Sequence, residues 1–438
     1  MPGTIALVNI GQLVTLAGPP RPRVGAELRE LGLIPDAALL IEEGRVEAAG
    51  PYVKLLPDIP PHAVVIDAGG KCVTPGFVDA HTHLVFAGNR AAEFEQRIAG
   101  ATYQQIAAAG GGILRTVAAT RAASEDELLA STRKHRDWML RSGTTTIEAK
   151  SGYGLDRATE MRMLQVIARI DSEGPSRLVP TLLAAHTIPP EFAERRADYV
   201  SWVADELIPE VAAAGLARYC DAFCDDHAFT LAETRTVLKS ARRQGLRLRI
   251  HAEQFCPGTG AALAAELGAA TADHLETVTD ETLRQLCNAG VQPVLLPGSV
   301  FALGRTQYPP ARKMIEAGLA IVLATDFNPG SSPIASMPMI LSLACLRMGL
   351  APAEALMAAT INAAYSLDLG NSLGSLEPGK EADFAIHEFD DYRELAYFIA
   401  APARPRVFIA GTEVTPAQVE FLPPKPVRRE VVRLRRSD

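Results

Sequence analysis

The middle of the chain alternates short apolar runs with longer amphipathic segments. Segments such as Ser124–Arg141 and Thr230–Gln244 have helical periodicity; the first opens with a Ser-x-x-Glu capping box, and Gly245 follows the second as a helix stop. Eight apolar runs have the length and composition of buried strands: Gly76–Ala80, Thr144–Glu148, Leu178–Ala185, Tyr219–Asp225, Leu246–His251, Ala270–His274, Val291–Leu296 and Ala320–Thr325. Strand–helix alternation predicts a parallel sheet, and eight units predict an α/β fold of the (β/α)8 TIM-like barrel type.

The two ends of the chain have a different pattern. Short apolar runs separated by Gly and Pro, without long amphipathic segments, occupy the start of the chain and return after Pro378. This pattern predicts a small β-sandwich domain built from both ends of the chain. We therefore expect residues 1–73 and 377–438 to form the composite β-sandwich and residues 74–376 to form the barrel.

Polar side chains gather where the predicted strands end. Five of the nine histidines end or closely follow strands one, three, five and six, and an aspartate follows strand eight: His81, His83, His186, His251, His274 and Asp326. Chance placement would scatter histidines among helices and loops. Because barrel enzymes carry their catalytic groups at the carboxyl ends of the strands, the pattern predicts one polar site at one mouth of the barrel.

This polar set has the composition of a metal site. His81 and His83 are two residues apart, so an extended backbone points both imidazoles to the same side. With His251 and Asp326 they make a set of the size that catalytic metals use while keeping a position for water. A metal lowers the pKa of such a water to about 7. Asp326 can then take the water's proton, and His274 can support the water or the substrate from the opposite side.

Composition narrows the class of protein. The 438 residues are 48% hydrophobic and 21% charged, as in an ordinary globular protein, and the net charge of −8 argues against a nucleic-acid partner. No apolar run of about 18 residues suggests a membrane span, and no secretory signal opens the chain. Six cysteines in a chain of this length do not form a disulfide framework, so we expect a cytoplasmic protein with no membrane partner.

The motifs together resemble the metal-dependent amidohydrolase superfamily, and within it the imidazolonepropionase family. The resemblance extends over nearly the whole chain, and it keeps a hydroxyl at Ser331, where many members of the family have Thr. The segments that carry it are Pro75–Leu84, Leu84–Arg90, Ala149–Leu155, Ala184–His186, His251–Phe255, Ala272–Glu276 and Thr325–Ser332.

The resemblance implies a reaction and a cofactor. The family adds water to 4-imidazolone-5-propanoate and opens the ring to N-formimidoyl-L-glutamate. It implies one zinc or iron ion per chain on the four ligands above, a choice that the His3Asp set leaves open, and it suggests a homodimer. Glu253, two residues beyond His251, would face the same site if the strand continues; it then serves either as a proton shuttle or as a carboxylate that orients a ligand.

The anionic substrate implies further binding residues. Its propionate calls for a cation with fork geometry, and Arg90 is the candidate. Tyr153 and His186 can donate hydrogen bonds, and Gln254 offers a donor and an acceptor to the ring amide. The remaining candidates are Asn328, Gly330 and Ser331 in the turn after Asp326, and, more weakly, Tyr103 before the Gly-rich run 107–112, which looks like a lid.

Two further motifs have other possible functions. Lys150 is a weak candidate for the carboxylated lysine that bridges two metals in related hydrolases. Cys220, Cys224 and His227 have zinc-like spacing, but the cysteines fall inside a strand and buried thiols are the favoured interpretation. Alternative functions are a deaminase or another cyclic-amide hydrolase, which Arg90, Tyr153 and Gln254 argue against, and an inactive scaffold, which the complete ligand set argues against.

Overall fold

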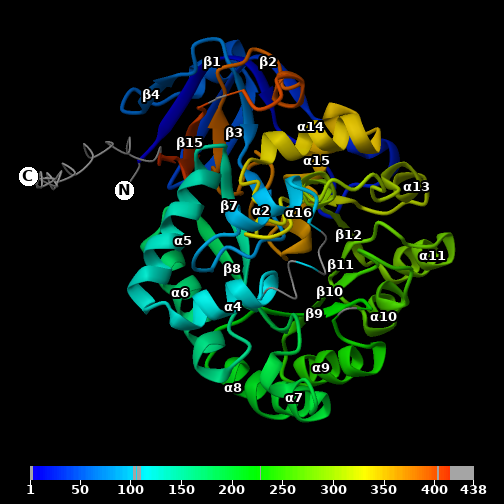
Figure 1. Cartoon of the computed structure of the whole chain (residues 1–438). Coiled ribbons are helices and arrows are strands. Elements are labelled where there is room, and N and C mark those ends of the chain that lie inside the picture. The colour runs from blue at the N-terminus through cyan, green and yellow to red at the C-terminus, as the bar shows by residue number, and fades with distance from the viewer. Residues whose placement is uncertain (1–2, 102–104, 106–109, 227, 402–403, 415–438) are drawn as a thin grey trace, which may run out of the picture.

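Two eight-stranded sheets organise the chain in this computed structural model, which describes residues 3–101, 105, 110–226, 228–401 and 404–414. One sheet is formed by both ends of the chain, and the other, with its surrounding helices, by the middle (Figure 1). The chain passes directly from one sheet to the other where β5 (Cys72–Pro75), a strand of the first sheet, leads into β6 (Phe77–Asp79), the first strand of the second.

The middle of the chain forms the predicted barrel. Its strands pair only in parallel and in sequence order, and each overlaps one of the eight apolar runs. They are β6 (Phe77–Asp79), β7 (Thr144–Lys150), β8 (Arg177–Ala185), β9 (Tyr219–Cys224), β10 (Arg247–Ala252), β11 (Thr271–His274), β12 (Gln292–Leu295) and β13 (Val322–Leu323). The prediction of a (β/α)8 barrel is confirmed.

Helices cover the outside of the barrel and fill the connections between its strands. The predicted capping box is present in α5, where Ser124 Oγ accepts from the amide of Glu127 and the Glu127 carboxylate accepts from the amide of Ser124. The helices are α1 (Tyr52–Leu55), α2 (Ala91–Ile98), α4 (Ile113–Ala122), α5 (Glu125–Leu140), α6 (Arg157–Glu173), α7 (Arg196–Trp202), α8 (Ile208–Ala213), α9 (Leu231–Arg243), α10 (Gly260–Leu267), α11 (Asp280–Ala289), α12 (Pro297–Ala302), α13 (Ala311–Glu316), α14 (Met337–Met348), α15 (Pro352–Ala358), α16 (Ile361–Ser366) and α17 (Glu394–Tyr397). Short helical turns are η1 (Gly25–Arg29), η2 (Leu56–Asp58), η3 (Pro190–Phe192) and the π-turn η4 (Val203–Leu207).

Hydrogen bonds between the first and last strands close the barrel. The Asp79 carboxylate at the end of β6 accepts from the amide and the hydroxyl of Thr325, at 3.1 and 2.6 Å. Just beyond, the amide of Asp326 donates to the carbonyl of His81 at 3.0 Å, and the amide of His83 donates to the carbonyl of Phe327 at 2.9 Å. This closure brings residues far apart in the sequence to the same mouth.

The two chain ends share the other sheet, as predicted. The described strands form one hydrogen-bonded sheet in the order β16-β15-β14-β5-β1-β2-β3, with β4 also paired to β1. Beside β5, its strands are β1 (Ile5–Val14), β2 (Leu33–Glu42), β3 (Arg45–Pro51), β4 (Val64–Asp67), β14 (Phe384–Ile386), β15 (Arg406–Ile409) and β16 (Thr412–Glu413). Apolar side chains from both ends, including Leu7, Leu39, Phe384 and Phe408, form its core.

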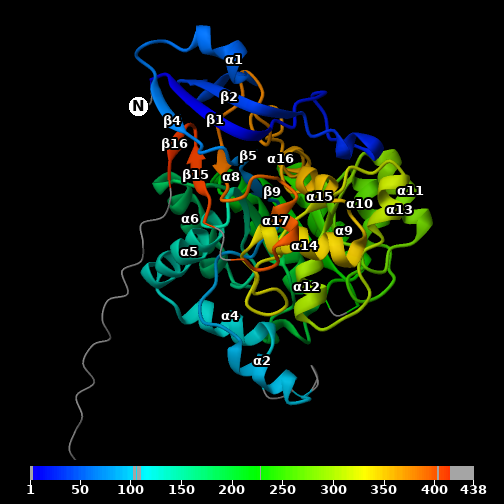
Figure 2. The ribbon, with the colours of Figure 1, turned by 90° about the horizontal axis from the view of Figure 1, so that it is seen from above.

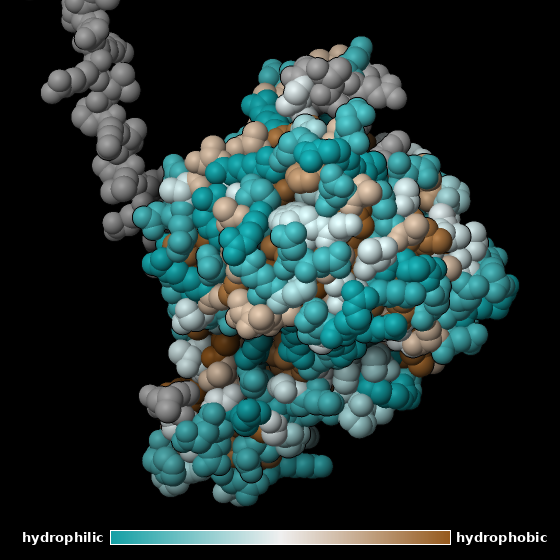
Figure 3. Space-filling view, turned by 90° about the horizontal axis from the view of Figure 1, so that it is seen from below, coloured by the Kyte–Doolittle hydropathy of each residue, from teal (hydrophilic) through white to brown (hydrophobic). Residues whose placement is uncertain are grey.

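The surface adds two observations. Seen from the side opposite the composite sheet, the molecule is mostly hydrophilic, with small separate apolar patches (Figure 3). Helices α2 and α4 lie at the edge of the molecule away from α1 (Figure 2). Within the described residues, no helix is both long enough and apolar enough to cross a membrane.

Candidate active site

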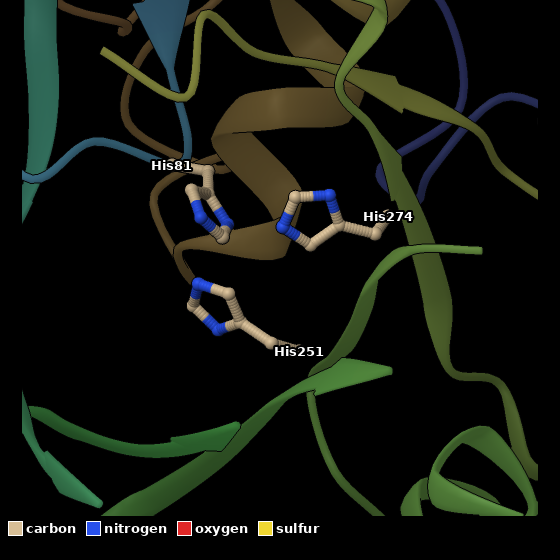
Figure 4. Close-up of side chains that lie close together, drawn as sticks. All are labelled: His81, His251 and His274. Carbon is tan, nitrogen blue, oxygen red and sulfur yellow. The ribbon is translucent and has the colours of Figure 1, made fainter. Parts of the chain in front are cut away.

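Three histidines from different strands meet at one mouth of the barrel. His81 follows β6, His251 lies in β10 and His274 ends β11, and their rings converge (Figure 4). Ligand atoms of these three residues all lie within 4.8 Å of one another. The same is true of His81, His83 and Asp326, so His81 belongs to both groups. The structure therefore brings together all four predicted metal ligands and His274.

The distances within this cluster fit a metal ion. Asp326 Oδ1 lies 3.4 Å from His83 Nε2 and 3.6 Å from His81 Nε2, and the Nε2 atoms of His83 and His251 are 3.5 Å apart. Four ligands bound tetrahedrally at zinc distances have neighbouring donor atoms about 3.4 Å apart. His81 Nε2 is buried and has no hydrogen-bond partner among the described residues. A buried imidazole nitrogen of this kind is suited to hold a metal.

Aspartates hold the outer nitrogens of two ligand histidines. His81 Nδ1 lies 2.6 Å from Asp273 Oδ2, and His251 Nδ1 lies 3.0 Å from Asp221 Oδ2. These contacts favour the tautomer whose Nε2 lone pair faces the site. Burial and the nearby Lys150 ammonium hold the pKa of His81 well below its ordinary value, which keeps the ring neutral and able to bind a metal.

Two buried cations stand behind these aspartates. Lys150 Nζ lies 2.8 Å from Glu148 and 2.9 Å from Asp221, and Arg249 lies 3.6 Å from Asp273. Burial lowers the pKa of Lys150, but Asp221 and Glu148 outweigh burial and the net direction is upward. Lys150 is therefore a paired ammonium here, a state unlike the carboxylated lysine of binuclear hydrolases.

Asp221, Asp273 and Arg249 were not among the predicted site residues. A signal was present, because Asp221, Arg249 and Asp273 are charged residues inside strands that are otherwise apolar. Charged residues inside a buried strand need partners, so their presence in three neighbouring strands indicates a charged interior for the barrel.

Non-glycine residues with positive φ cluster at this mouth. The backbone φ is 51° at Glu253, 81° at His274 and 53° at Asp326. L-residues rarely adopt such angles, and where they do the strain is often associated with a functional site.

Burial lowers the pKa of His274, but the facing Glu276 carboxylate, 3.5 Å from Nδ1, outweighs burial and raises the pKa of His274 overall.

The predicted anion-binding residues lie beside the cluster. The Arg90 guanidinium lies directly over Gly330, where even a Cβ would collide with it, and Arg90 hydrogen-bonds to the buried Tyr153 hydroxyl. The ring of His186 stacks on His83, with 5.0 Å between centroids, and its Nδ1 lies 3.0 Å from the carbonyl of Gly152. Burial holds the pKa of His186 well below its ordinary value, so this ring is neutral.

The turn after Asp326 is held by its own side chains. Asn328 Oδ1 accepts from the amides of Gly330 and Ser331 at 2.8 and 2.7 Å, and its Nδ2 donates to the carbonyl of Asp326 at 2.7 Å. Ser331 Oγ lies 3.4 Å from Asp326 Oδ2. Asn328 therefore shapes the turn that carries Gly330 beneath Arg90.

Glu253 is placed differently from the expectation that assumed a continuing strand. Strand β10 ends at Ala252, and the positive φ at Glu253 turns the chain away from the extended path. The Glu253 carboxylate accepts from the amide of Ala261, at 3.2 Å to each oxygen. Burial raises its pKa to about 7. Gln254, the next residue, is buried beside it.

Two predicted positions lie outside the described residues, Tyr103 and His227. Of the zinc-like triplet, the structure describes Cys220 and Cys224, which are buried free thiols in β9. Burial raises the pKa of Cys220 and Cys224, which favours the protonated thiol over the thiolate that binds zinc.

Comparison with known proteins identifies the family to which this chain is similar. The Amidohydrolase family profile matches residues 72–414. The imidazolonepropionase of Solibacter usitatus (strain Ellin6076) is 57% identical over 406 residues, which are 93% of this chain and 97% of that protein. The imidazolonepropionase of Symbiobacterium thermophilum is 47% identical over 388 residues, 88% and 91% of the two chains.

The chain belongs to the amidohydrolase family, among the imidazolonepropionases. Its fold is also that of an adenosine deaminase from Xanthomonas campestris solved with bound zinc, with a TM-score of 0.69 at 19% identity, covering 94% of this chain and 93% of that one. Amidohydrolases are metal-dependent hydrolases of carbon–nitrogen bonds, and the His and Asp groups described above are able to hold a metal.

Proposed function

We propose that this chain hydrolyses 4-imidazolone-5-propanoate to N-formimidoyl-L-glutamate, a ring opening in histidine degradation. The observation that carries this function is the 57% identity to a curated imidazolonepropionase over 93% of the chain. Water supplies a hydroxyl to the ring carbonyl carbon and a proton to the ring nitrogen as the carbon–nitrogen bond breaks. The substrate is a small anion, which fits a barrel mouth that contains Arg90.

The proposed cofactor is one zinc or iron ion per chain, held by His81, His83, His251 and Asp326. The contacts of 3.4–3.6 Å among their donor atoms and the unpartnered His81 Nε2 support this ligand set. When bound, the ion lowers the pKa of a water to about 7 and polarises the carbonyl that the water attacks. Asp273 and Asp221 keep the histidine lone pairs directed at the ion's position.

The chain's own residues orient the substrate. Arg90 binds the propionate through its guanidinium fork, and Tyr153, which already hydrogen-bonds to Arg90, donates to the same carboxylate. Gln254 pairs with the ring amide, and His186 offers Nε2 as a hydrogen-bond acceptor, because the neutral ring carries its proton on Nδ1 and donates it to the Gly152 carbonyl. In the turn after Asp326, Asn328, Gly330 and Ser331 complete the pocket; Tyr103 remains a weaker candidate.

Three side chains share the movement of protons. Asp326 Oδ2 accepts the proton of the attacking water, and His274 holds the water or the developing oxyanion from the other side. Glu253, whose carboxylate accepts from the amide of Ala261 in this structure, is proposed either to deliver a proton to the leaving ring nitrogen or to orient a ligand. Its pKa of about 7, raised by burial, suits a group that both gives and takes a proton near neutral pH.

A single assay tests the function. The absorbance of 4-imidazolone-5-propanoate should fall on adding the enzyme, the fall should stop after chelation, and it should return when zinc or iron is restored. Absence of turnover by metal-loaded enzyme, or turnover indifferent to chelation, contradicts the proposal. Glutamate release from the same substrate would instead identify a different hydrolysis.

We further assign residues 1–73 and 377–438 to a composite β domain and residues 74–376 to the barrel domain. A cytoplasmic location is supported by the six cysteines, all of them free thiols. A homodimer is proposed on the family resemblance, supported by the exposed apolar side chains at α14 and α17.

A further inference from the structure

We propose that Asp225 and Arg305 are positioning residues that fix the loop Glu253–Phe255, here called the β10 loop, and so hold Gln254 against the substrate ring. The inference rests on the proposed function, because Gln254 contacts substrate only if the substrate is the small cyclic amide. Neither residue belongs to the metal ligands or to the anion-binding set. Each acts on the loop backbone.

The β10 loop cannot use the strand ladder for its backbone hydrogen bonds. Strand β10 ends at Ala252, and the positive φ at Glu253 breaks the extended path. Backbone amides and carbonyls in a buried loop need partners from elsewhere. On one flank, Asp225 Oδ2 accepts from the amide of Gln254 at 3.1 Å and from the amide of Phe255 at 3.0 Å.

Arg305 and Thr277 supply the other flank. Arg305 Nη1 donates to the carbonyl of Gln254 at 3.1 Å, and its guanidinium carbon lies 4.9 Å from the centre of the Phe255 ring. The amide and the hydroxyl of Thr277 donate to the carbonyl of Glu253 at 3.0 and 2.9 Å. The loop is thus held by residues that follow three other barrel strands, β9, β11 and β12.

The geometry separates this role from a general contribution to folding. Arg305 donates to the carbonyl of Gln254 and Asp225 accepts from the amide of Phe255, the two oppositely directed groups of one trans peptide unit, and Asp225 also accepts from the amide of Gln254. Hydrogen bonds with one charged partner are shorter and stronger than neutral ones, so the peptide units of Gln254 are held firmly. A shift of about 1 Å in a positioned group costs about a hundredfold in rate, so small loop movements reach the substrate.

The experiment compares Asp225→Ala and Arg305→Met with wild-type metal-loaded enzyme. Both variants should raise KM for 4-imidazolone-5-propanoate about tenfold, with a smaller change in kcat, while the metal content per chain stays that of the wild type. Asp225→Asn should recover most of the wild-type KM, because an amide oxygen still accepts from the two backbone amides. Arg305→Met keeps the test available if Asp225→Ala does not fold.

Asp171→Ala is the matched control. Asp171 also holds a backbone amide of the barrel, that of Leu178 at 2.7 Å, but it lies in the last turn of α6, before β8, at the end of the barrel opposite the site. Its loss should lower the unfolding temperature and leave KM unchanged.

A double-mutant cycle identifies the route of the effect. If Asp225 acts through Gln254, then Asp225→Ala should change KM much less in a Gln254→Ala background than in the wild type. Independent effects of the two substitutions, or a wild-type KM in Asp225→Ala and Arg305→Met, overturn the inference while leaving the proposed function standing. A wild-type enzyme with no turnover overturns both.

Discussion

At the scale of single residues, the Lys150 ammonium joins the candidate metal site to the interior of the barrel. It is fully buried between Glu148 and Asp221, and Asp221 in turn holds His251. Lys150→Met should therefore leave two buried carboxylates without their cation and destabilise the fold by about 3–5 kcal/mol. It should also weaken metal binding about 10- to 100-fold, because Asp221 no longer holds the ligand histidine in place.

Competition with a chelating dye, together with thermal unfolding, measures both effects of Lys150→Met. Lys71→Met is the control, since Lys71 pairs with Asp390 at 2.8 Å on the surface of the composite sheet. That variant should keep wild-type metal affinity. Wild-type metal affinity in Lys150→Met would show that Asp221 holds His251 without help from the lysine.

Residues that carry the site differ in how visible they are in the sequence. That His81, His83, His251 and Asp326 lie together could be predicted, because each ends or follows an apolar run and the carboxyl ends of barrel strands meet at one mouth. The residues that hydrogen-bond to these side chains could not be predicted, because their positions depend on how strands pair across the barrel. Asp273, for example, is 192 positions from the His81 ring it holds.

At the scale of elements, strand β14 lies between two buried titratable groups, Asp383 and His387. His387 lies 2.8 Å from the Thr74 hydroxyl, and burial lowers its pKa to about 4. Because the unfolded value is about 6.5, the unfolded chain binds more protons between these pH values. The stabilising contribution of neutral His387 is therefore complete above about pH 6.5 and is lost as the pH falls towards 4, by about 3 kcal/mol in total.

His387→Gln removes this titration and keeps a group that can bond to Thr74. The stability difference between wild type and His387→Gln, from urea unfolding at several pH values, should shrink as the pH falls from 7 to 4.5. Burial raises the pKa of Asp383 to about 6, which gives the opposite pH dependence, but Asp383 is present in both proteins and cancels in the comparison. Parallel pH curves would contradict the assignment.

Elements were predictable where local pattern decides them. The long apolar runs at β7 to β10 are compatible only with strands. Strand β13, in contrast, is only Val322–Leu323, and beyond it the hydrogen bonds from Thr325 to Asp79 take the place of further strand pairing. The end of β10 at Ala252 had no such signal, because the turn at Glu253 is imposed by Asp225, Thr277 and Ala261 from other segments. Tertiary contacts decided what local preference left open.

At the scale of the whole molecule, one apolar surface is exposed where α14 meets α17. Ser342 of α14 donates to the carbonyl of Ala396 in α17 at 2.8 Å, so Leu346, four residues later, lies on the same side of α14. Leu346 is 66% exposed, and Tyr397 and Ile399 are 74% and 52% exposed. Apolar side chains gathered in this way on a soluble surface typically mark a protein–protein contact.

We therefore expect the proposed homodimer to form through this surface. Sedimentation velocity at micromolar concentration should show a dimer for the wild type and a monomer for the double variant Leu346→Asp, Tyr397→Asp, because two symmetry-related copies would bury four uncompensated carboxylates in the interface. Val65→Asp is the control, since Val65 is 61% exposed on β4, in the composite sheet. A monomeric wild type would contradict the proposed dimer. A double variant that is still dimeric would show that the dimer interface lies on another face of the molecule.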